Sequence, residues 1–256
     1  MKHKILFLSS NELGYEVFKQ CLESIDADFY VMTLSKESNV VMYDEIDNEL
    51  WHNCCKNVIE IKSIREESSK EFIKLLDPDL IIMCGWRQII SKEIFQIPRL
   101  GTISFHPTPL PKGRGPSPII NSILEGWKES AVTMFYVDEG TDSGDIIDQS
   151  FFKIEEEDYA YDVYKKCIKA SRELIKRNIS NVLYETSSRH PQDDDNATYL
   201  KKLSLLDNKI STDCSPEIAH RKIRAFSYPY LGAFFEIGDK KIIIDKARIC
   251  TKIKKY

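Results

Sequence analysis

The sequence lacks a long apolar run. Its most apolar stretch is "LIIMCG" at residues 80–85, and the run after the basic N-terminus covers only residues 5–8. A membrane-spanning helix needs about 20 apolar residues, and the apolar region of a signal peptide needs about 7–15. We therefore expect a cytoplasmic protein with no membrane partner.

Cysteine shows no organised spacing. The seven cysteines are an odd number, no C-x-x-C occurs, and Cys54 and Cys55 are adjacent. Disulfide frameworks and structural zinc sites are typically marked by spaced pairs. The pattern favours a reducing compartment, and we expect no bound metal.

A glycine-rich phosphate loop is also missing. The first apolar run continues as "LSSNELG", where a dinucleotide-binding unit would carry G-x-G-x-x-G. This absence argues against a nicotinamide-dependent dehydrogenase.

Lys and Arg are outnumbered by Asp and Glu over residues 1–199 and exceed them only in the C-terminal part. The net charge is −4, but residues 200–256 carry 13 Lys and Arg against 6 Asp and Glu. A basic segment can bind nucleic acid or the phosphates of a small molecule, although solvated surface lysines are the more common explanation.

Apolar runs alternate with helical periodicity over the first half of the chain. This alternation favours an open, twisted, mostly parallel α/β sheet of the Rossmann-like kind, with helices on both faces. Strands are predicted at residues 4–10, 28–35, 57–61, 80–85 and 100–105, with helices at 12–25, 66–76 and 118–127.

The second half of the chain predicts a smaller unit after a polar linker. Two further strands at 131–140 and 144–154 and a helix at 158–178 complete a catalytic domain over residues 1–186. The linker "SSRHPQDDDNAT" then opens a small C-terminal α+β subdomain over residues 187–256. We expect this subdomain to contain a helix at 216–224, a proline-fixed turn at 228–230, and a hairpin of residues 232–237 and 240–245 covering the mouth of the first domain.

One strand ends in a histidine and a proline-rich loop, "SFHPTPLPKGRGPSP" at residues 104–118. Alternation along a strand places Ser104 and His106 on the same face. Prolines cannot extend the sheet, so the loop should form a stiff wall beside His106. A single histidine in this position is as often a hydrogen-bonded cap as a functional group.

A second polar segment, "DEGTDSGDII" at residues 138–147, lies in the turn between two predicted strands. If those strands neighbour the one that bears His106, Asp142 can reach the imidazole. By itself this segment could equally be a solvated turn, and its acids do not have the spacing of a calcium loop.

The two segments together resemble the signature of the folate-dependent formyltransferases. This family includes methionyl-tRNA formyltransferase, glycinamide ribonucleotide transformylase and the sugar N-formyltransferases, and the similarity extends over most of residues 4–180. The resemblance implies that His106 and Asp142 are catalytic and that N10-formyltetrahydrofolate is the cofactor. It also implies folate contacts from "CGWRQIISKEIF" and "YVDEG", at Cys84, Gly85, Trp86, Arg87, Ile89, Asp138, Glu139 and Gly140.

One position departs from the family pattern. The family carries an asparagine two residues before the histidine, where it helps to hold the oxyanion, and this chain has Ser104. Serine donates one proton over a shorter reach, and loss of an oxyanion donor costs about 10²–10³ in rate. We expect serine, a water molecule or protonated His106 to take over this role.

The chemistry implied by the resemblance is amine formylation without a metal. His106 takes the excess proton of the attacking amine, and Asp142 orients the imidazole and raises its basicity.

The acceptor implied by the resemblance is a nucleotide-linked amino sugar. The stretch 219–247 resembles the C-terminal part of the sugar N-formyltransferases, and about 60 residues after the linker are too few for the C-terminal barrel of methionyl-tRNA formyltransferase. Candidate contacts to the acceptor are Ser10, Asn11, Thr108, Lys112, Arg114, Arg224, Tyr228 and Tyr230. Solvated charge, helix capping by Asn11 and burial of the tyrosines would explain the same residues.

Three other functions stay open at this point. Ser104, His106 and Asp142 include the residue types of a hydrolase triad, but no nucleophile elbow surrounds the serine. A formyltetrahydrofolate hydrolase would use water in place of the amine. A non-catalytic protein with a decayed site could bind a nucleotide sugar or RNA, although we expect nucleic acid not to be a partner. A homodimer through the C-terminal unit would fit the family.

Overall fold

The computed structural model describes residues 2–40, 43–204 and 206–250. Seven strands form one sheet in the order β3-β2-β1-β4-β5-β6-β7. The first five strands along the chain are parallel, and β6 and β7 are antiparallel to their neighbours. The strands are β1 Lys4–Leu8, β2 Asp28–Leu34, β3 Val58–Ile61, β4 Leu80–Met83, β5 Thr102–His106, β6 Glu129–Tyr136 and β7 Ile146–Lys153.

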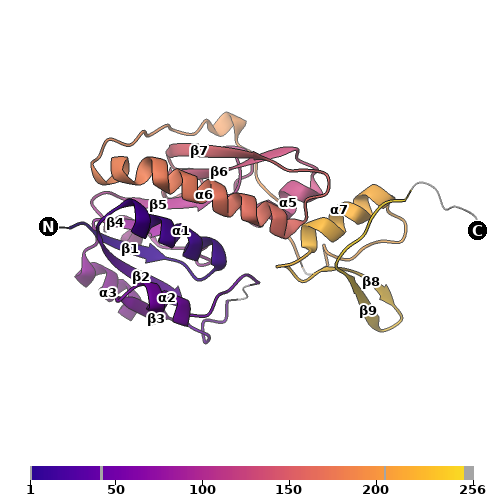
Figure 1. Cartoon of the computed structure of the whole chain (residues 1–256), viewed down its shortest axis with the longest axis horizontal. Coiled ribbons are helices and arrows are strands. Elements are labelled where there is room, and N and C mark those ends of the chain that lie inside the picture. The colour runs from indigo at the N-terminus through magenta and orange to yellow at the C-terminus, as the bar shows by residue number, and fades with distance from the viewer. Residues whose placement is uncertain (1, 41–42, 205, 251–256) are drawn as a thin grey trace, which may run out of the picture.

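Helices cover both faces of the sheet. Helices α1 (Glu12–Ser24) and α6 (Ala160–Leu183) lie side by side over one face, and α3 (Glu67–Leu76) and α4 (Lys92–Phe95) lie on the other (Figure 1). The predicted Rossmann-like α/β fold is therefore confirmed. Among the described residues, no helix combines the length and apolar character that a bilayer crossing requires.

The alternation of side chains along each strand explains why helices cover both faces of the sheet. In β1, Ile5 and Phe7 pack into the core beneath α1 and α6, whereas Leu6 and Leu8 pack into the core beneath α3 and α4. All four side chains are fully buried, and each contributes about 1.5–3 kcal/mol through burial. A strand buried on both faces is apolar throughout, which is the pattern that predicted a parallel sheet.

The helix predictions need two corrections. The short helices α2 (Glu49–Cys54) and α4 were not predicted, because each has too few residues to show a helical period. Helix α6 continues to Leu183, beyond the predicted end at residue 178.

The C-terminal part forms the predicted helix and hairpin. Helix α7 (Pro216–Phe226) begins after Ser215, whose Oγ accepts a hydrogen bond from the Ile218 N–H, and it packs against α5 (Pro118–Leu124). Strands β8 (Ala233–Ile237) and β9 (Lys240–Ile244) pair with each other. The expectation that the hairpin covers the first domain is wrong, because it extends away from the main sheet (Figure 1).

We call residues 190–200 the strap. The strap overlaps the predicted linker at 187–198 and extends past its end. The strap is not a free connection. His190 forms an antiparallel bridge with Ile146, and Tyr199 forms a parallel bridge with Arg114. The Thr198 carbonyl accepts the N–H groups of Gly113 and Arg114. The strap therefore joins the start of β7 to the proline-rich loop, and the division into two domains at residue 187 stays a prediction.

Candidate active site

Strand β5 presents His106 at its carboxyl end. Its register places Ser104 opposite Phe135 and His106 opposite Thr133 of β6. His106 is only 7% exposed, whereas Ser104 is half-buried. Among the described residues, the Ser104 hydroxyl makes no hydrogen bond, so it is available to donate to a ligand.

The proline-rich loop fixes the orientation of the imidazole. The Nε2 atom of His106 lies 2.8 Å from the Gly113 carbonyl oxygen. Because a carbonyl oxygen can only accept, Nε2 must carry the proton of this hydrogen bond. In neutral His106 the lone pair is then on Nδ1, and Nδ1 is the atom that can take up a proton.

Asp142 faces that same nitrogen. Its Oδ2 atom lies 3.5 Å from His106 Nδ1 and also accepts the Gly115 N–H at 2.9 Å. The carboxylate would stabilise a proton on Nδ1. Asp142 has a left-handed backbone (φ 51°), a conformation that Asp adopts more readily than most residues. The structure thus brings together His106 and Asp142, and Ser104 lies two residues before His106 on the same face of β5.

The loop after β4 offers unused polar groups. The buried Trp86 Nε1 has no hydrogen-bond partner, and among the described residues no backbone hydrogen bond is formed by Gly85, Trp86 or Arg87. Gly85 has φ +67°, and a Cβ on it would lie 1.9 Å from Asn11 Oδ1. Only glycine fits here, which lets this backbone pass close to the end of β1.

The loop after β6 lies beside the loop after β4. An ion pair joins Glu139 to Lys92, and Val137 and Trp86 pack on the same apolar cluster. The Asp138 carboxylate folds back to accept from the Gly140 N–H and the Ser143 hydroxyl, which shapes the turn. The free backbone groups of residues 85–87 therefore lie in a loop that is joined to the turn after β6.

The other predicted folate contacts differ in accessibility. Cys84 is buried, and burial raises the pKa of its thiol, so only its backbone could reach a ligand. Ile89 is 78% exposed, so its side chain is accessible. Arg87 forms an ion pair with Asp44, with 2.5 Å between Nη2 and Oδ1.

Ser10 and Asn11 are occupied by the fold, which removes the basis for their predicted acceptor contacts. Ser10 Oγ accepts the Leu34 N–H at 3.0 Å. Asn11 caps α1 by accepting the Gly14 N–H, and its Nδ2 donates to Asp44 at 2.8 Å. Both side chains are buried, so the helix-cap alternative is correct for Asn11.

Two of the three candidates in the proline-rich loop are also structural. The Thr108 hydroxyl donates to the Gly113 carbonyl. Arg114 is 2% exposed and donates to Gln192, Asp194 and Tyr199, so its predicted phosphate contact needs correction. Burial opposes the charge of Arg114, but the hydrogen bonds to Tyr199 and Asp194 outweigh it and raise the pKa. Lys112 remains exposed, with its Nζ 4.0 Å from the centre of the Trp127 ring.

The predicted acceptor contacts in the C-terminal part also include both buried and accessible residues. Arg224 is buried and donates to the Asp158 carbonyl, and burial lowers its pKa, so a phosphate contact through it is no longer supported. Tyr230 is half-buried with its ring edge-on to Tyr43. Tyr228 is 67% exposed and packs edge-on against Tyr161, which makes it the accessible aromatic of this loop.

Sequence reasoning missed Asp44. Its Oδ2 accepts from Asn11 and from the Tyr164 hydroxyl, and its Oδ1 binds Arg87. Burial and the Asp44 carboxylate raise the pKa of Tyr164. Asp44 thereby ties the cap of α1 to the loop after β4. No motif surrounds Asp44 in the sequence, so no local signal could have identified it.

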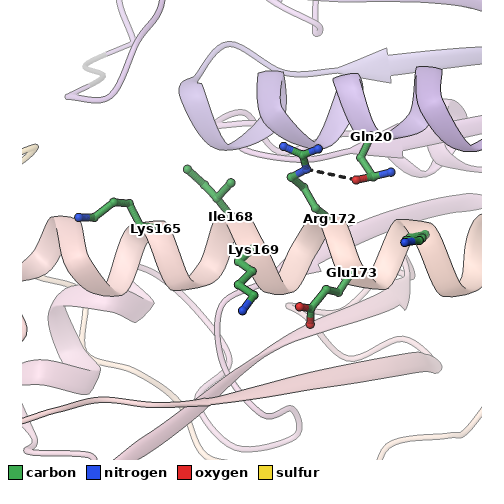
Figure 2. Close-up of a pocket in the computed structure, with 7 residues that line it drawn as sticks. Gln20, Lys165, Ile168, Lys169, Arg172 and Glu173 are labelled. Carbon is green, nitrogen blue, oxygen red and sulfur yellow. Dashed lines mark hydrogen bonds between the residues drawn. The ribbon is translucent and has the colours of Figure 1, made fainter.

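Two surface grooves lie away from His106. One, of about 390 Å³, runs along α6 and is lined by Lys165, Arg172 and Glu173, with Arg172 donating to Gln20 of α1 (Figure 2). The other, of about 850 Å³, lies beside Lys128 and residues 153–157. Among the described residues, no cluster of three His, Cys, Asp or Glu side chains could hold a metal ion.

Comparison with known proteins identifies the family. The family described as "Formyl transferase" matches residues 4–179. The bifunctional polymyxin resistance protein ArnA of Wigglesworthia glossinidia brevipalpis is 34% identical over 254 residues, which are 96% of this chain and 38% of ArnA. A methionyl-tRNA formyltransferase of Staphylococcus epidermidis is 29% identical over 192 residues, which are 75% of this chain and 62% of that enzyme. The chain therefore spans less than two thirds of either relative.

A solved structure shares the fold over most of both chains. The N-formyltransferase from Helicobacter canadensis, in complex with folinic acid and dTDP-3-aminofucose, superposes with a TM-score of 0.73 at 22% identity. The match covers 95% of this chain and 87% of that one. Because the family match covers more than half of its residues, the chain belongs to the formyl transferase family.

Proposed function

We propose that this protein transfers a formyl group from N10-formyltetrahydrofolate to the amino group of a UDP- or dTDP-linked amino-dideoxy sugar, for the synthesis of a surface polysaccharide or glycan. The observation that carries the formyl-transfer proposal is the approach of Asp142 Oδ2 to His106 Nδ1, at 3.5 Å beyond the carboxyl end of β5. Membership of the formyl transferase family supports it.

The protein's own residues manage protons and charge in this proposal. N10-formyltetrahydrofolate supplies the formyl group. His106 Nδ1 takes the excess proton of the acceptor amine, because Nε2 is engaged by Gly113. Asp142 stabilises the resulting imidazolium. His106 would then return a proton to the folate nitrogen as its bond to the formyl carbon breaks, so that tetrahydrofolate leaves. The Ser104 hydroxyl donates a hydrogen bond to the negative charge that develops on the formyl oxygen.

The two neighbouring loops would hold the folate. Trp86 Nε1 is a buried donor without a partner, and the free backbone groups of residues 85–87 can pair with the edge of a pterin. The turn at Asp138, Glu139 and Gly140 would form the opposite wall. Because no described residue pairs with Trp86 Nε1, this buried donor supports a ligand at this position.

The acceptor proposal depends on a different part of the chain. Tyr228 offers an exposed ring for stacking on a base, and Lys112 offers an exposed ammonium group for a diphosphate. The shared fold with the Helicobacter canadensis enzyme, which was crystallised with dTDP-3-aminofucose, supports a nucleotide sugar. A cytoplasmic location completes the proposal, and the seven unspaced cysteines, which favour a reducing compartment, support it.

The decisive experiment supplies 10-formyltetrahydrofolate with a panel of UDP- and dTDP-linked amino sugars. Product mass should rise by one formyl group for at least one sugar. Formate release without any acceptor would instead indicate a hydrolase. Binding of a nucleotide sugar without formylation, unchanged in His106→Asn, would indicate a non-catalytic protein.

Methionyl-tRNA is the second candidate acceptor. The observation that favours it is the sequence match to methionyl-tRNA formyltransferases, including 31% identity over 96% of this chain for the Orientia tsutsugamushi enzyme. Methionyl-tRNA should therefore be included in the panel. Its formylation, with every sugar unreactive, would overturn the proposed acceptor while leaving formyl transfer intact.

Ser104 tests how the departure from the family pattern is tolerated. We expect Ser104→Ala to lower kcat by about 10²-fold, because it removes an oxyanion donor, and Ser104→Asn to stay within about tenfold of the wild type. Steady-state kinetics at saturating folate would measure both. A wild-type kcat in Ser104→Ala would show that the hydroxyl is not the donor.

The exposed apolar face of the hairpin leads us to predict a homodimer. Ile237 and Ile242 lie on one face of β8–β9 and are 65% and 50% exposed. A two-stranded sheet is marginally stable alone, and exposed apolar patches mark interfaces. We expect light scattering to show a dimer that becomes a monomer in Ile237→Lys/Ile242→Lys but not in Ile218→Lys, an exposed control on α7. A wild-type monomer at all concentrations would contradict this.

A further inference from the structure

We propose that Gln192, in the strap, is a positioning residue that holds Asp142 against His106. The inference rests on the proposed function, since it concerns the same catalytic pair. Gln192 lies outside both motifs that led to His106 and Asp142, and it is 50 residues from Asp142 in the sequence.

The amide of Gln192 bridges two loops of the site. Its Nε2 donates to the Asp142 carbonyl at 2.9 Å and to the Gly144 carbonyl at 2.8 Å. Its Oε1 accepts from Nε and Nη2 of Arg114 at 3.1 and 2.9 Å. All the hydrogen-bonding capacity of this side chain is therefore used between the Asp142 turn and the proline-rich loop.

The chemistry of its partners fixes the orientation of this amide. A guanidinium only donates and a carbonyl only accepts, so the oxygen must face Arg114 and the NH₂ group must face the turn. Arg114 is itself immobilised by Asp194 and Tyr199 within the strap. Gln192 thus anchors the turn to a group that is 2% exposed and that also donates to two further acceptors of the strap.

This anchor acts where the turn needs support. Asp142 has a left-handed backbone, which Asp tolerates better than most residues but does not prefer over the right-handed and extended regions. The Asp142 carboxylate reaches the Gly115 N–H and His106 only if its backbone is held in place. Loss of the two Gln192 donors frees the main chain of Asp142 and Gly144, and the carboxylate no longer stays beside Nδ1.

The experiment compares Gln192→Ala and Gln192→Glu with Asp142→Asn and the double variant Gln192→Ala/Asp142→Asn. We expect Gln192→Ala to lower kcat by about 10- to 100-fold with KM for the folate within about threefold. Gln192→Glu should lose as much, because a carboxylate keeps the contact with Arg114 but cannot donate to the turn. In the Asp142→Asn background, Gln192→Ala should cost less than threefold, because the two residues act as a unit.

A spectroscopic measurement keeps the test independent of catalysis. In protein with ¹⁵N-labelled histidine at one fixed pH, Asp142→Asn should shift the His106 Nδ1 resonance, and Gln192→Ala should shift it in the same direction. The matched control is Asn57→Ala, which removes a side-chain amide that donates to the Phe29 carbonyl at the opposite end of the sheet. That variant should leave the resonance unchanged.

The outcomes separate this inference from the proposed function. An unshifted Nδ1 resonance in Gln192→Ala, with a clear shift in Asp142→Asn, would overturn the positioning role, as would fully additive losses of kcat. If the wild type formylates nothing, the proposed function fails, and the resonance still decides whether Gln192 holds the pair.

Discussion

Replacing His106 with asparagine is expected to lower kcat for formyl transfer by about 10²–10⁴-fold, the usual contribution of a general acid–base group. The asparagine side chain is too short to reach the Gly113 carbonyl as His106 Nε2 does, but this carbonyl keeps the Thr108 hydroxyl as a donor. The asparagine offers no basic nitrogen toward Asp142. The loss should therefore appear in kcat, with KM for the folate within about threefold, because the folate loops are untouched. Steady-state formylation of the best sugar measures both constants.

The control for this substitution is His52→Asn. His52 is an exposed histidine that pairs with Glu60 on the outer edge of the sheet. The His52→Asn variant should keep the wild-type kcat for formyl transfer. Activity of His106→Asn within tenfold of the wild type, with the fold intact by circular dichroism, would mean that another group accepts the proton.

Asp142→Asn is expected to lower kcat by about 10²–10³-fold, since it removes the charge that stabilises the imidazolium. The geometry should survive the change. The Gly115 N–H donates to the position of Oδ2, so the amide oxygen rather than the NH₂ group must occupy that position. The variant therefore separates the charge of Asp142 from its shape, and kcat at saturating substrates is the quantity to compare.

Two comparisons make the Asp142 result interpretable. Asp26→Asn, at an exposed aspartate paired with Lys2, should leave the rate unchanged. The kcat of the double variant His106→Asn/Asp142→Asn should be within about threefold of the kcat of His106→Asn, because the carboxylate works only through the imidazole. Multiplied losses in the double variant would show that Asp142 acts on the substrate by a separate route.

Residues with local patterns were predictable from the sequence. The two-sided burial of β1 and the alternation of Ser104 and His106 on β5 both follow from the period of a strand. Proline also identified the stiff loop after His106. Asp142 lies in the turn after β6, and β6 pairs with β5, which bears His106. The sequence could therefore predict their proximity on the condition that these strands are neighbours.

Residues that act through long-range contacts were not predictable. Asp44, Arg114 and Gln192 owe their places to partners that lie far away along the chain, and the polar composition of the strap indicated only a linker. Arg114 also shows why a cation near a candidate site is a weak signal. Its charge is satisfied by acceptors from the strap, which no local window of sequence contains.

The distribution of the site along the chain has an evolutionary consequence. Ser104, His106 and Asp142 come from the middle of the chain, whereas Tyr228, the proposed stacking contact of the acceptor, comes from its C-terminal part. Substitutions in the later segment can thus accumulate without disturbing the proton-handling pair. A lineage built on this scaffold could diversify the amines it modifies while its one-carbon donor stays the same.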